Sequence, residues 1–449
     1  MSLTAKIIQT VQSKPLLLQS LWSLLARFAG VALNFAVVLI ITNRLPKADA
    51  GNLLLLMTFV TGVALISRLG TDQLLMKEVA SSHNTHSEFR GAFLKSGFQA
   101  VLLLSLVFMA LWLLASPAIL DRFFDHSISL HDLMLSSVGI LFFNLVILNS
   151  TYLKAVKQTV YGVLGQNALP AVTFLVLIGI FWNAFVQNQN YLNVYTASLV
   201  LAGILAILIT RHFLKLAAQT TAIGDLAISG QLSAPGYIRL IKLSLPLAPV
   251  SIFSYLMLFA DTIMVGWFLP NDQVADYSVA AKISYIILFF LQALEATIYP
   301  RLLNIYQHDK PRLIAFFWQS TTLVVGVVLS VTLFMYLLSD WLLIAFGKDY
   351  IVAKQALGLL LLAQFLRAAS ITFSFMFIIK EKVRYLNIIL VTALLANLFF
   401  NVVLIKHFGI EGAAMATLIA NATLLFLVLA LFYWHKLLDK PTRHKGSTT

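Results

Sequence analysis

The sequence predicts an all-α polytopic membrane protein with about twelve transmembrane helices in two halves of six. Hydrophobic residues make up 60% of the 449 residues and charged residues only 11%, whereas soluble domains carry about 25% charged residues. Apolar stretches long enough to cross a bilayer as helices recur along the whole chain. Lys and Arg gather in alternate loops, which is typical of membrane topology.

Each expected span is a mainly apolar stretch of about 20 residues or more, which favours helices over barrel strands. In chain order the expected spans are 18–41, 51–70, 93–115, 133–153, 164–183, 192–213, 243–268, 277–298, 313–338, 355–378, 385–406 and 411–433. Loops on one side are rich in cations, Lys77 and Lys154 among them, and loops on the other side are poor in them. The positive-inside rule therefore predicts that both termini are cytoplasmic. It also accounts for most of the net charge of +13 without a nucleic-acid partner.

The longest internal polar stretch, about 214–240, divides the spans into six and six. We expect an N-terminal bundle over 1–220, a cytoplasmic linker over 221–240, a C-terminal bundle over 241–435 and a basic cytoplasmic tail over 436–449. The halves share a weak internal echo, with Leu-Pro and a short acidic turn after the first span of each. Such repeats are common in transporters, although short outer hairpins often use the same residues.

Four cations fall inside expected spans: Arg27, Arg68, Lys282 and Arg367. Arg27 lies near the middle of its span, on a face with small and polar residues that include Asn34. An arginine at that depth faces protein or water, so the face predicts a hydrated interior surface.

The other three cations leave alternatives open. Arg68 lies near the cytoplasmic end of its span, where it either snorkels or pairs with Asp72. Lys282 shares a stripe with Tyr285 and either faces the interior or snorkels outward. Arg367 lies near the centre of its span, one turn from Gln364. We predict that the four cations bind substrate and that Asn34, Tyr285 and Gln364 line a polar cavity.

Two carboxylates fall inside expected spans with a candidate role in ion coupling, Asp261 and Glu295. Asp261 either forms a structural ion pair with Lys282 or is a site that exchanges H⁺ or binds Na⁺, as Glu295 could also be. Asn397 and Asn401, one turn apart, are expected to form interhelical hydrogen bonds.

A hydrated interior with an excess of cations suits a phosphate, a pyrophosphate or an acidic sugar, because arginine binds phosphate through two parallel hydrogen bonds. The chain has no Cys, and it lacks a phosphate-binding loop of the Walker type and a catalytic constellation, so we expect no enzyme, no metal and no cofactor. The spacing His83-x-x-His86 lacks further ligands.

Five segments resemble a known family. They are "NRLPKADAGNLLLL" (43–56) with "RLGTDQLLMKEVA" (68–80), "DTIMVGWFLPNDQVADYSVAAKI" (261–283), "FGKDYIVAKQALGLLL" (346–361) and "ANLFFNVVLIKHFGIEGAAMATLIAN" (396–421). They resemble the Wzx-type O-antigen and exopolysaccharide flippases, in the superfamily of multidrug, oligosaccharidyl-lipid and polysaccharide exporters. The chain departs from the family's usual second-half turn at Ala275, where glycine is common.

The resemblance implies two six-helix bundles around a central cavity in the cell inner membrane. It implies alternating access, driven by a proton or sodium gradient, that moves an undecaprenyl-pyrophosphate-linked oligosaccharide from the cytoplasmic to the outer leaflet. Membrane lipid, a polysaccharide polymerase and a chain-length regulator are the other expected partners.

Rival interpretations remain at this stage. A drug or toxin exporter of the same fold would rely on anionic cavity residues, which the excess of cations disfavours. A lipid II flippase usually carries further C-terminal spans that are not predicted here. A non-transporting scaffold for glycosyltransferases would tolerate neutral residues at Arg27 and Arg367.

Overall fold

The computed structural model describes residues 15–81, 87–124, 127–186, 190–221 and 235–438. Every regular element within these ranges is a helix. The chain divides into two compact units, Met1–Phe259 (unit 1) and Ala260–Thr449 (unit 2), which are described separately. The boundary lies within one helix, α12 (Ala248–Phe268), which begins in unit 1 and ends in unit 2.

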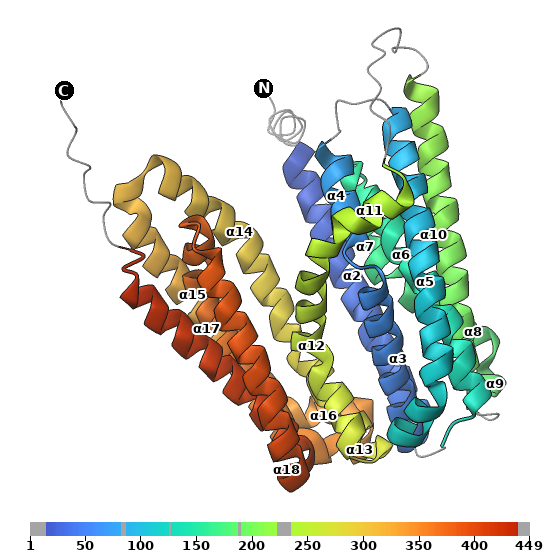
Figure 1. Ribbon diagram of the computed structural model, residues 1–449. Helices are drawn as coiled ribbons and strands as arrows, with labels where there is room; N and C mark the ends of the chain where they lie inside the picture. The colour runs from blue at the N-terminus through green and yellow to red at the C-terminus, as the bar shows by residue number, and fades with distance from the viewer. Residues whose placement is uncertain (1–14, 82–86, 125–126, 187–189, 222–234, 439–449) are drawn as a thin grey trace, which may run out of the picture. The chain divides into compact units, whose positions relative to one another are not determined.

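Unit 1 is a bundle of long helices with shorter segments between them (Figure 1). Its elements before α12 are α2 (Pro15–Arg44), α3 (Lys47–Ser67), α4 (Thr71–Ser81), α5 (Ser87–Phe124), α6 (Leu130–Ala155), α7 (Thr159–Asn167), α8 (Leu169–Ile180), α9 (Trp182–Val186), α10 (Tyr191–Thr221), α11 (Tyr237–Ser244) and η1 (Leu245–Leu247). Helix α6 packs against α3, α5, α7 and α10 and is therefore central to the unit. The short helix α11 packs against α4 and α5.

Unit 2 is built from the end of α12 and the helices that follow it. They are α13 (Asn271–Ser284), α14 (Ile286–His308), α15 (Lys310–Leu337), α16 (Ser339–Phe346), η2 (Lys348–Ala353), α17 (Lys354–Ile379) and α18 (Val383–Trp434). Helix α17 is central, in contact with α13, α14, α15 and α18. The rings of Phe317 and Phe432 stack, and Phe373 meets both of them edge to face, so this apolar contact joins α15, α17 and α18.

Two spans are interrupted, each for a local reason. In α18 the backbone leaves the helix at Gly409, whose φ of 57° is in the left-handed region that glycine adopts without strain. The segments α7 and α8 meet at an angle of 47°, and Pro170 follows the bend directly. Proline has no backbone N–H, so a regular helix cannot run through this point without losing a hydrogen bond.

When the two interrupted spans are taken into account, the number of spanning helices in the structure agrees with the number expected from the sequence. By length and apolarity, nine helices in the described ranges can cross a membrane, and the bent pair α7–α8 makes a tenth. Gly409 divides α18 into two helices, and α12 is a further apolar helix, so the described ranges accommodate the expected twelve. The prediction of an all-α polytopic membrane protein is confirmed. Most of the expected linker 221–240 and of the expected tail 436–449 lies outside the described residues.

Candidate functional site

The predicted site residues are divided between the two units. Unit 1 contains Arg27, Asn34 and Arg68, and unit 2 contains the others. Those in unit 2 are Asp261, Lys282, Tyr285, Glu295, Gln364 and Arg367. Each unit therefore contains predicted site residues on its helices.

The most complete cluster surrounds Asp261, whose side chain is only 8% exposed. Asn397 and Asn401 each donate a side-chain N–H to its Oδ1, at 2.9 and 2.7 Å. The Tyr277 hydroxyl donates to Oδ2 at 3.1 Å, and the Thr417 hydroxyl donates to the same oxygen. Both carboxylate oxygens are thus held by two donors each.

Local structure brings these donors together. Asn397 and Asn401 lie one turn apart on the first half of α18, so both side chains project from the same face. The break at Gly409 reverses the chain, and Thr417 follows on the second half. The sequence predicted interhelical hydrogen bonds from the two asparagines, and their partner is Asp261 of α12. Sequence analysis did not single out Tyr277 or Thr417 as members of this site.

No cation neutralises Asp261 within the part of unit 2 that the structure describes. The structural ion pair with Lys282, one of the two interpretations left open by the sequence, is absent among these residues, and all four partners of Asp261 are neutral. The Oδ1 atom of Asn401 is buried and accepts no hydrogen bond. Carboxylate, amide and hydroxyl oxygens are ligands of hard cations, so the donor set suits a small cation or a proton.

A second polar cluster in unit 2 lies on α14 and α17. Arg367 is half-buried and interacts electrostatically with Glu295 and with Tyr285, which connects α13 to α14. One turn before Arg367, the Gln364 side chain is buried and its Oε1 has no hydrogen-bond partner. The structure therefore groups four of the predicted residues. Lys282 is half-buried on α13 and forms no ion pair within the described ranges.

In unit 1, Arg68 belongs to a buried network. The chain leaves α3 after Ser67 and turns through Leu69 and Gly70, both with positive φ, before α4 begins. Across this turn Arg68 Nε lies 3.5 Å from Asp72 Oδ2, which is the pairing that one of the two interpretations expected. Arg68 Nη1 also donates to Asn144 Oδ1 at 2.8 Å.

Asn144 on α6 extends this network to two further helices. Its amide donates to the Ser67 hydroxyl at 2.7 Å and to the Ser105 hydroxyl of α5 at 2.8 Å. Since all four of these side chains, Arg68 included, are buried, the network joins α3, α5 and α6 inside the bundle.

Asn34 joins α2 to the bend between α7 and α8. Its side-chain N–H groups donate to the carbonyls of Gly30 and Asn167, at 2.7 and 2.8 Å. Asn167 is the last residue of α7, where the interrupted helix leaves carbonyls without their usual partners. Gly30 permits the close approach, because a Cβ there would lie 2.6 Å from the Cβ of Asn167.

Arg27 lies one turn before Gly30, is exposed on unit 1, and interacts electrostatically with Lys154 in the last turn of α6. Helix α2 has 30 residues, whereas a helix needs only about 20 to cross the bilayer core. The position of a residue along α2 therefore does not define its depth in the membrane. Arg27 lies within electrostatic range of Lys154.

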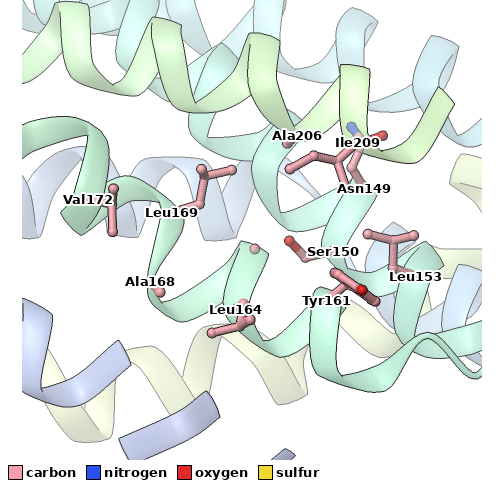
Figure 2. Close-up of a pocket in the computed structure, with 11 residues that line it drawn as sticks. Asn149, Ser150, Leu153, Tyr161, Leu164, Ala168, Leu169, Val172, Ala206 and Ile209 are labelled. Carbon is pink, nitrogen blue, oxygen red and sulfur yellow. The ribbon is translucent and has the colours of Figure 1, made fainter. Parts of the chain in front are cut away.

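Unit 1 also contains an apolar pocket of about 260 Å³ beside the bend of α7 and α8 (Figure 2). Its floor includes Asn149 and Ser150 of α6, both buried, and its rim includes Tyr161, Val172 and Ile209, which are exposed. Almost all of the lining is hydrocarbon, so the pocket suits an apolar occupant rather than the headgroup of a charged ligand.

No group of three or more His, Asp or Glu side chains that could hold a metal ion occurs in the described ranges. His83 and His86 lie outside them. Among the predicted site residues, Asp261, Gln364 and Arg68 are buried in the described ranges.

Comparison with known families places the chain among membrane transporters. A family model described as "Polysaccharide biosynthesis protein" matches residues 16–306, and one described as MatE matches residues 246–403. An uncharacterized membrane protein of Methanocaldococcus jannaschii is 24% identical over 443 residues, which cover 93% of this chain and 83% of the relative. A protein described as a probable low-salt glycan biosynthesis flippase, Agl15 of Haloferax volcanii, is 27% identical over 180 residues, covering 38% of this chain and 37% of the relative.

Solved structures show the same fold at low sequence identity. The lipid II flippase MurJ in an inward closed conformation has a TM-score of 0.67 at 14% identity, over 93% of this chain and 87% of that one. An inward-facing multidrug resistance transporter of the MATE family has a TM-score of 0.63 at 15% identity, over 92% and 97% of the two chains. Both a flippase and a drug exporter thus share this fold, so the fold does not distinguish between their substrates.

Proposed function

The chain belongs to the polysaccharide biosynthesis protein family of membrane transporters, and on that basis we propose that it is a flippase for an undecaprenyl-pyrophosphate-linked oligosaccharide. It moves this substrate from the cytoplasmic to the outer leaflet of the cell inner membrane by alternating access. A gradient of H⁺ or Na⁺ drives the movement. The proposal of ion coupling rests on one observation, the buried carboxylate of Asp261 with four neutral donors.

Asp261 is the stronger of the two coupling candidates. Burying a carboxylate is costly, and hydrogen bonds from neutral groups offset only part of that cost. A proton or a small cation at the carboxylate removes the remaining charge, so occupancy changes the energy of this part of unit 2. Glu295 differs because Arg367 already supplies an opposite charge nearby.

The arrangement in unit 2 suggests how an ion affects the helices. The four donors come from α13 and from both halves of α18, while the carboxylate is on α12. When a cation takes the carboxylate, the asparagine amides must turn their oxygens toward it, and the hydroxyl groups must donate their hydrogen bonds to other acceptors. Binding therefore rearranges contacts among three helices, which is the differential interaction that coupling requires.

A lipid-linked, phosphate-bearing substrate fits the cations of the spans. Arg367 and Lys282 are half-buried on helices α17 and α13, which contact each other in unit 2. Arginine and lysine recognise phosphate oxygens directly. The relative from Haloferax volcanii is described as a flippase of glycan biosynthesis, which favours a glycan carrier over a drug as substrate.

The test follows a fluorescent undecaprenyl-pyrophosphate oligosaccharide between the leaflets of proteoliposomes, with an imposed H⁺ or Na⁺ gradient. We expect gradient-dependent transfer by the wild type and at least a tenfold slower transfer by Asp261→Asn. Asp340→Asn is the matched control, since Asp340 is a half-exposed carboxylate of unit 2 that pairs with Lys354 at 2.8 Å.

Two results would overturn parts of the proposal. Gradient-dependent transfer that is unchanged in Asp261→Asn would remove this site from coupling. No transfer by the wild type, with gradient-driven export of a cationic dye instead, would replace the flippase by a drug exporter of the same fold.

A further inference from the structure

Helix α11 differs from the long helices of unit 1 because it is short and lies across them (Figure 1). Its eight residues bury Leu240 in an apolar cluster that includes Phe93 of α5 and Tyr152 of α6. Phe93 is the first residue of the expected span 93–115, and Tyr152 lies one residue before the end of the expected span 133–153. Helix α11 therefore packs against unit 1 at the level where two spans meet the membrane surface.

Close packing holds α11 in this position. Ser244 is buried one turn after Leu240, on the same side of the helix. A Cβ at Gly70, in the turn between α3 and α4, would lie 2.9 Å from the carbonyl oxygen of Ser244 and 2.8 Å from the Cβ of Leu247. One side of α11 is thus fixed against α4, α5 and this turn, so its opposite side points away from unit 1.

The opposite side, which we call the outward face, consists of Ile238, Arg239, Lys242 and Leu243. Ile238 and Lys242 are one turn apart, as are Arg239 and Leu243, so each row of the face has one cation and one apolar side chain. Ile238 is 57% exposed and Leu243 is 51% exposed. A helix that lies in a membrane interface combines basic and large apolar side chains in this way.

Neither cation of the outward face is neutralised within the described ranges. Arg239 and Lys242 are both exposed, and neither forms an ion pair with a described carboxylate. Together with Gly236, Tyr237 and Ile238 they line a hollow of about 410 Å³. Two cations beside apolar side chains suit a ligand that joins an anionic group to hydrocarbon.

We propose that the outward face of α11 binds anionic phospholipid of the cytoplasmic leaflet. Arg239 and Lys242 pair with the phosphate of the headgroup, while Ile238 and Leu243 extend among the acyl chains. The cytoplasmic leaflet carries anionic lipids, and the charge pattern of the loops predicts that this end of unit 1 is cytoplasmic. The inference rests on the multi-pass membrane fold and not on the identity of the transported substrate.

The test uses the absence of Cys from the chain, because one introduced cysteine is then a unique site for a fluorophore. Leu245 directly follows α11, is 54% exposed and does not line the hollow, so Leu245→Cys is suitable. The labelled full-length protein is placed in nanodiscs of phosphatidylglycerol and phosphatidylcholine, with bromine on the acyl chains of one lipid at a time. Bromine quenches a fluorophore on contact, so the mole fraction that gives half-maximal quenching reports which lipid lies beside α11.

We expect half-maximal quenching at a mole fraction at least fivefold lower for phosphatidylglycerol than for phosphatidylcholine. A basic residue near an anionic membrane strengthens binding about fivefold, so Arg239→Gln and Lys242→Gln should each reduce this preference and the double variant should abolish it. Arg239→Lys should keep most of it. Arg384→Gln is the matched control, because it removes an exposed arginine from α18 in unit 2, and it should leave the preference unchanged.

Three results would overturn the proposal. They are equal half-maximal mole fractions of the two lipids in the wild type, a preference that survives in the double variant, and an equal loss in Arg384→Gln. In detergent without phospholipid all variants should unfold at the wild-type temperature, since the changed side chains are exposed, and this excludes loss of the fold as the cause.

The substrate is the other possible source of phosphate at this face. If undecaprenyl pyrophosphate at about a tenth of the mole fraction of phosphatidylglycerol abolished the quenching, the face would belong to the substrate and the proposal would be wrong. The glycan-transfer assay gives an independent result. A lipid preference without glycan transfer would refute the flippase and keep this site, whereas glycan transfer without a lipid preference would do the reverse.

Discussion

Unit 1 and unit 2 each bury a charged side chain among membrane-spanning helices, and they compensate its charge in different ways. Arg68 in unit 1 has an ionic partner, Asp72, and an amide acceptor, Asn144. Asp261 in unit 2 has four neutral donors and no ionic partner in the described ranges. Both charges are almost fully enclosed, at 5% and 8% exposure, so the contrast does not come from depth of burial.

The difference separates a structural charge from an exchangeable one. In the Arg68 network the opposite charges cancel within the protein, so binding a further ion there would leave an excess charge buried. At Asp261 the protein leaves one negative charge uncancelled, so a cation or proton lowers the electrostatic cost. The uncancelled site is the better candidate for coupling, and mutations can test that distinction.

The largest effect on stability is expected from Arg68→Met. The change leaves the Asp72 carboxylate and the Asn144 amide with fewer partners inside the bundle, and breaking a buried ion pair typically costs about 3–5 kcal/mol. We therefore expect a marked fall in the unfolding temperature of the purified protein in detergent. Arg239→Met, at an exposed arginine on α11 of the same unit, is the control and should change it little. An unchanged unfolding temperature in Arg68→Met would show that the network is not structural.

A smaller effect is expected from Asn401→Leu beside Asp261. The substitution removes one of four donors, and a lost hydrogen bond to a buried group costs about 1–3 kcal/mol. Because the other three donors remain, we expect a modest fall in unfolding temperature together with a change in the ion concentration that gives half-maximal transport. The control is Thr392→Val, since the Thr392 hydroxyl bonds only to the Ile388 carbonyl of its own helix. An altered ion dependence in the control but not in Asn401→Leu would contradict a coupling role for this site.

The sequence predicted the helical spans well because membrane hydrocarbon imposes a simple rule of length and apolarity. The two halves of α18 were predicted on either side of Gly409, and α2, α3 and α6 were predicted to within a few residues at most ends. The turn between α3 and α4 was not predicted, since Arg68 and Asp72 have the spacing of one helical face and nothing in that spacing reveals a turn at Leu69 and Gly70.

The candidate sites were predicted only in part, because contacts between distant segments are not encoded in local spacing. The sequence singled out Asp261 and the two asparagines separately, but their convergence depends on how α12 and α18 pack. Thr417 and Tyr277 give no local signal, since hydroxyls are common in such helices. Lys154 was predicted to be one of the cations that set topology, and its contact with Gln166 on α7 has no signal in the local sequence.

The smallest effects on stability are expected from substitutions at two glycines, one in each unit, whose surroundings are packed differently. In unit 1, Gly30→Ala places a Cβ 2.6 Å from the Asn167 Cβ, and such overpacking typically costs about 1–3 kcal/mol, offset in part by the better helix propensity of alanine. In unit 2, Gly326 on α15 has open space around its Cβ position, so Gly326→Ala should be neutral or stabilising by up to about 1 kcal/mol. The unfolding temperature in detergent should therefore fall for Gly30→Ala and stay unchanged or rise for Gly326→Ala. A fall for Gly326→Ala and none for Gly30→Ala would mean that α2 is free to move away from α7.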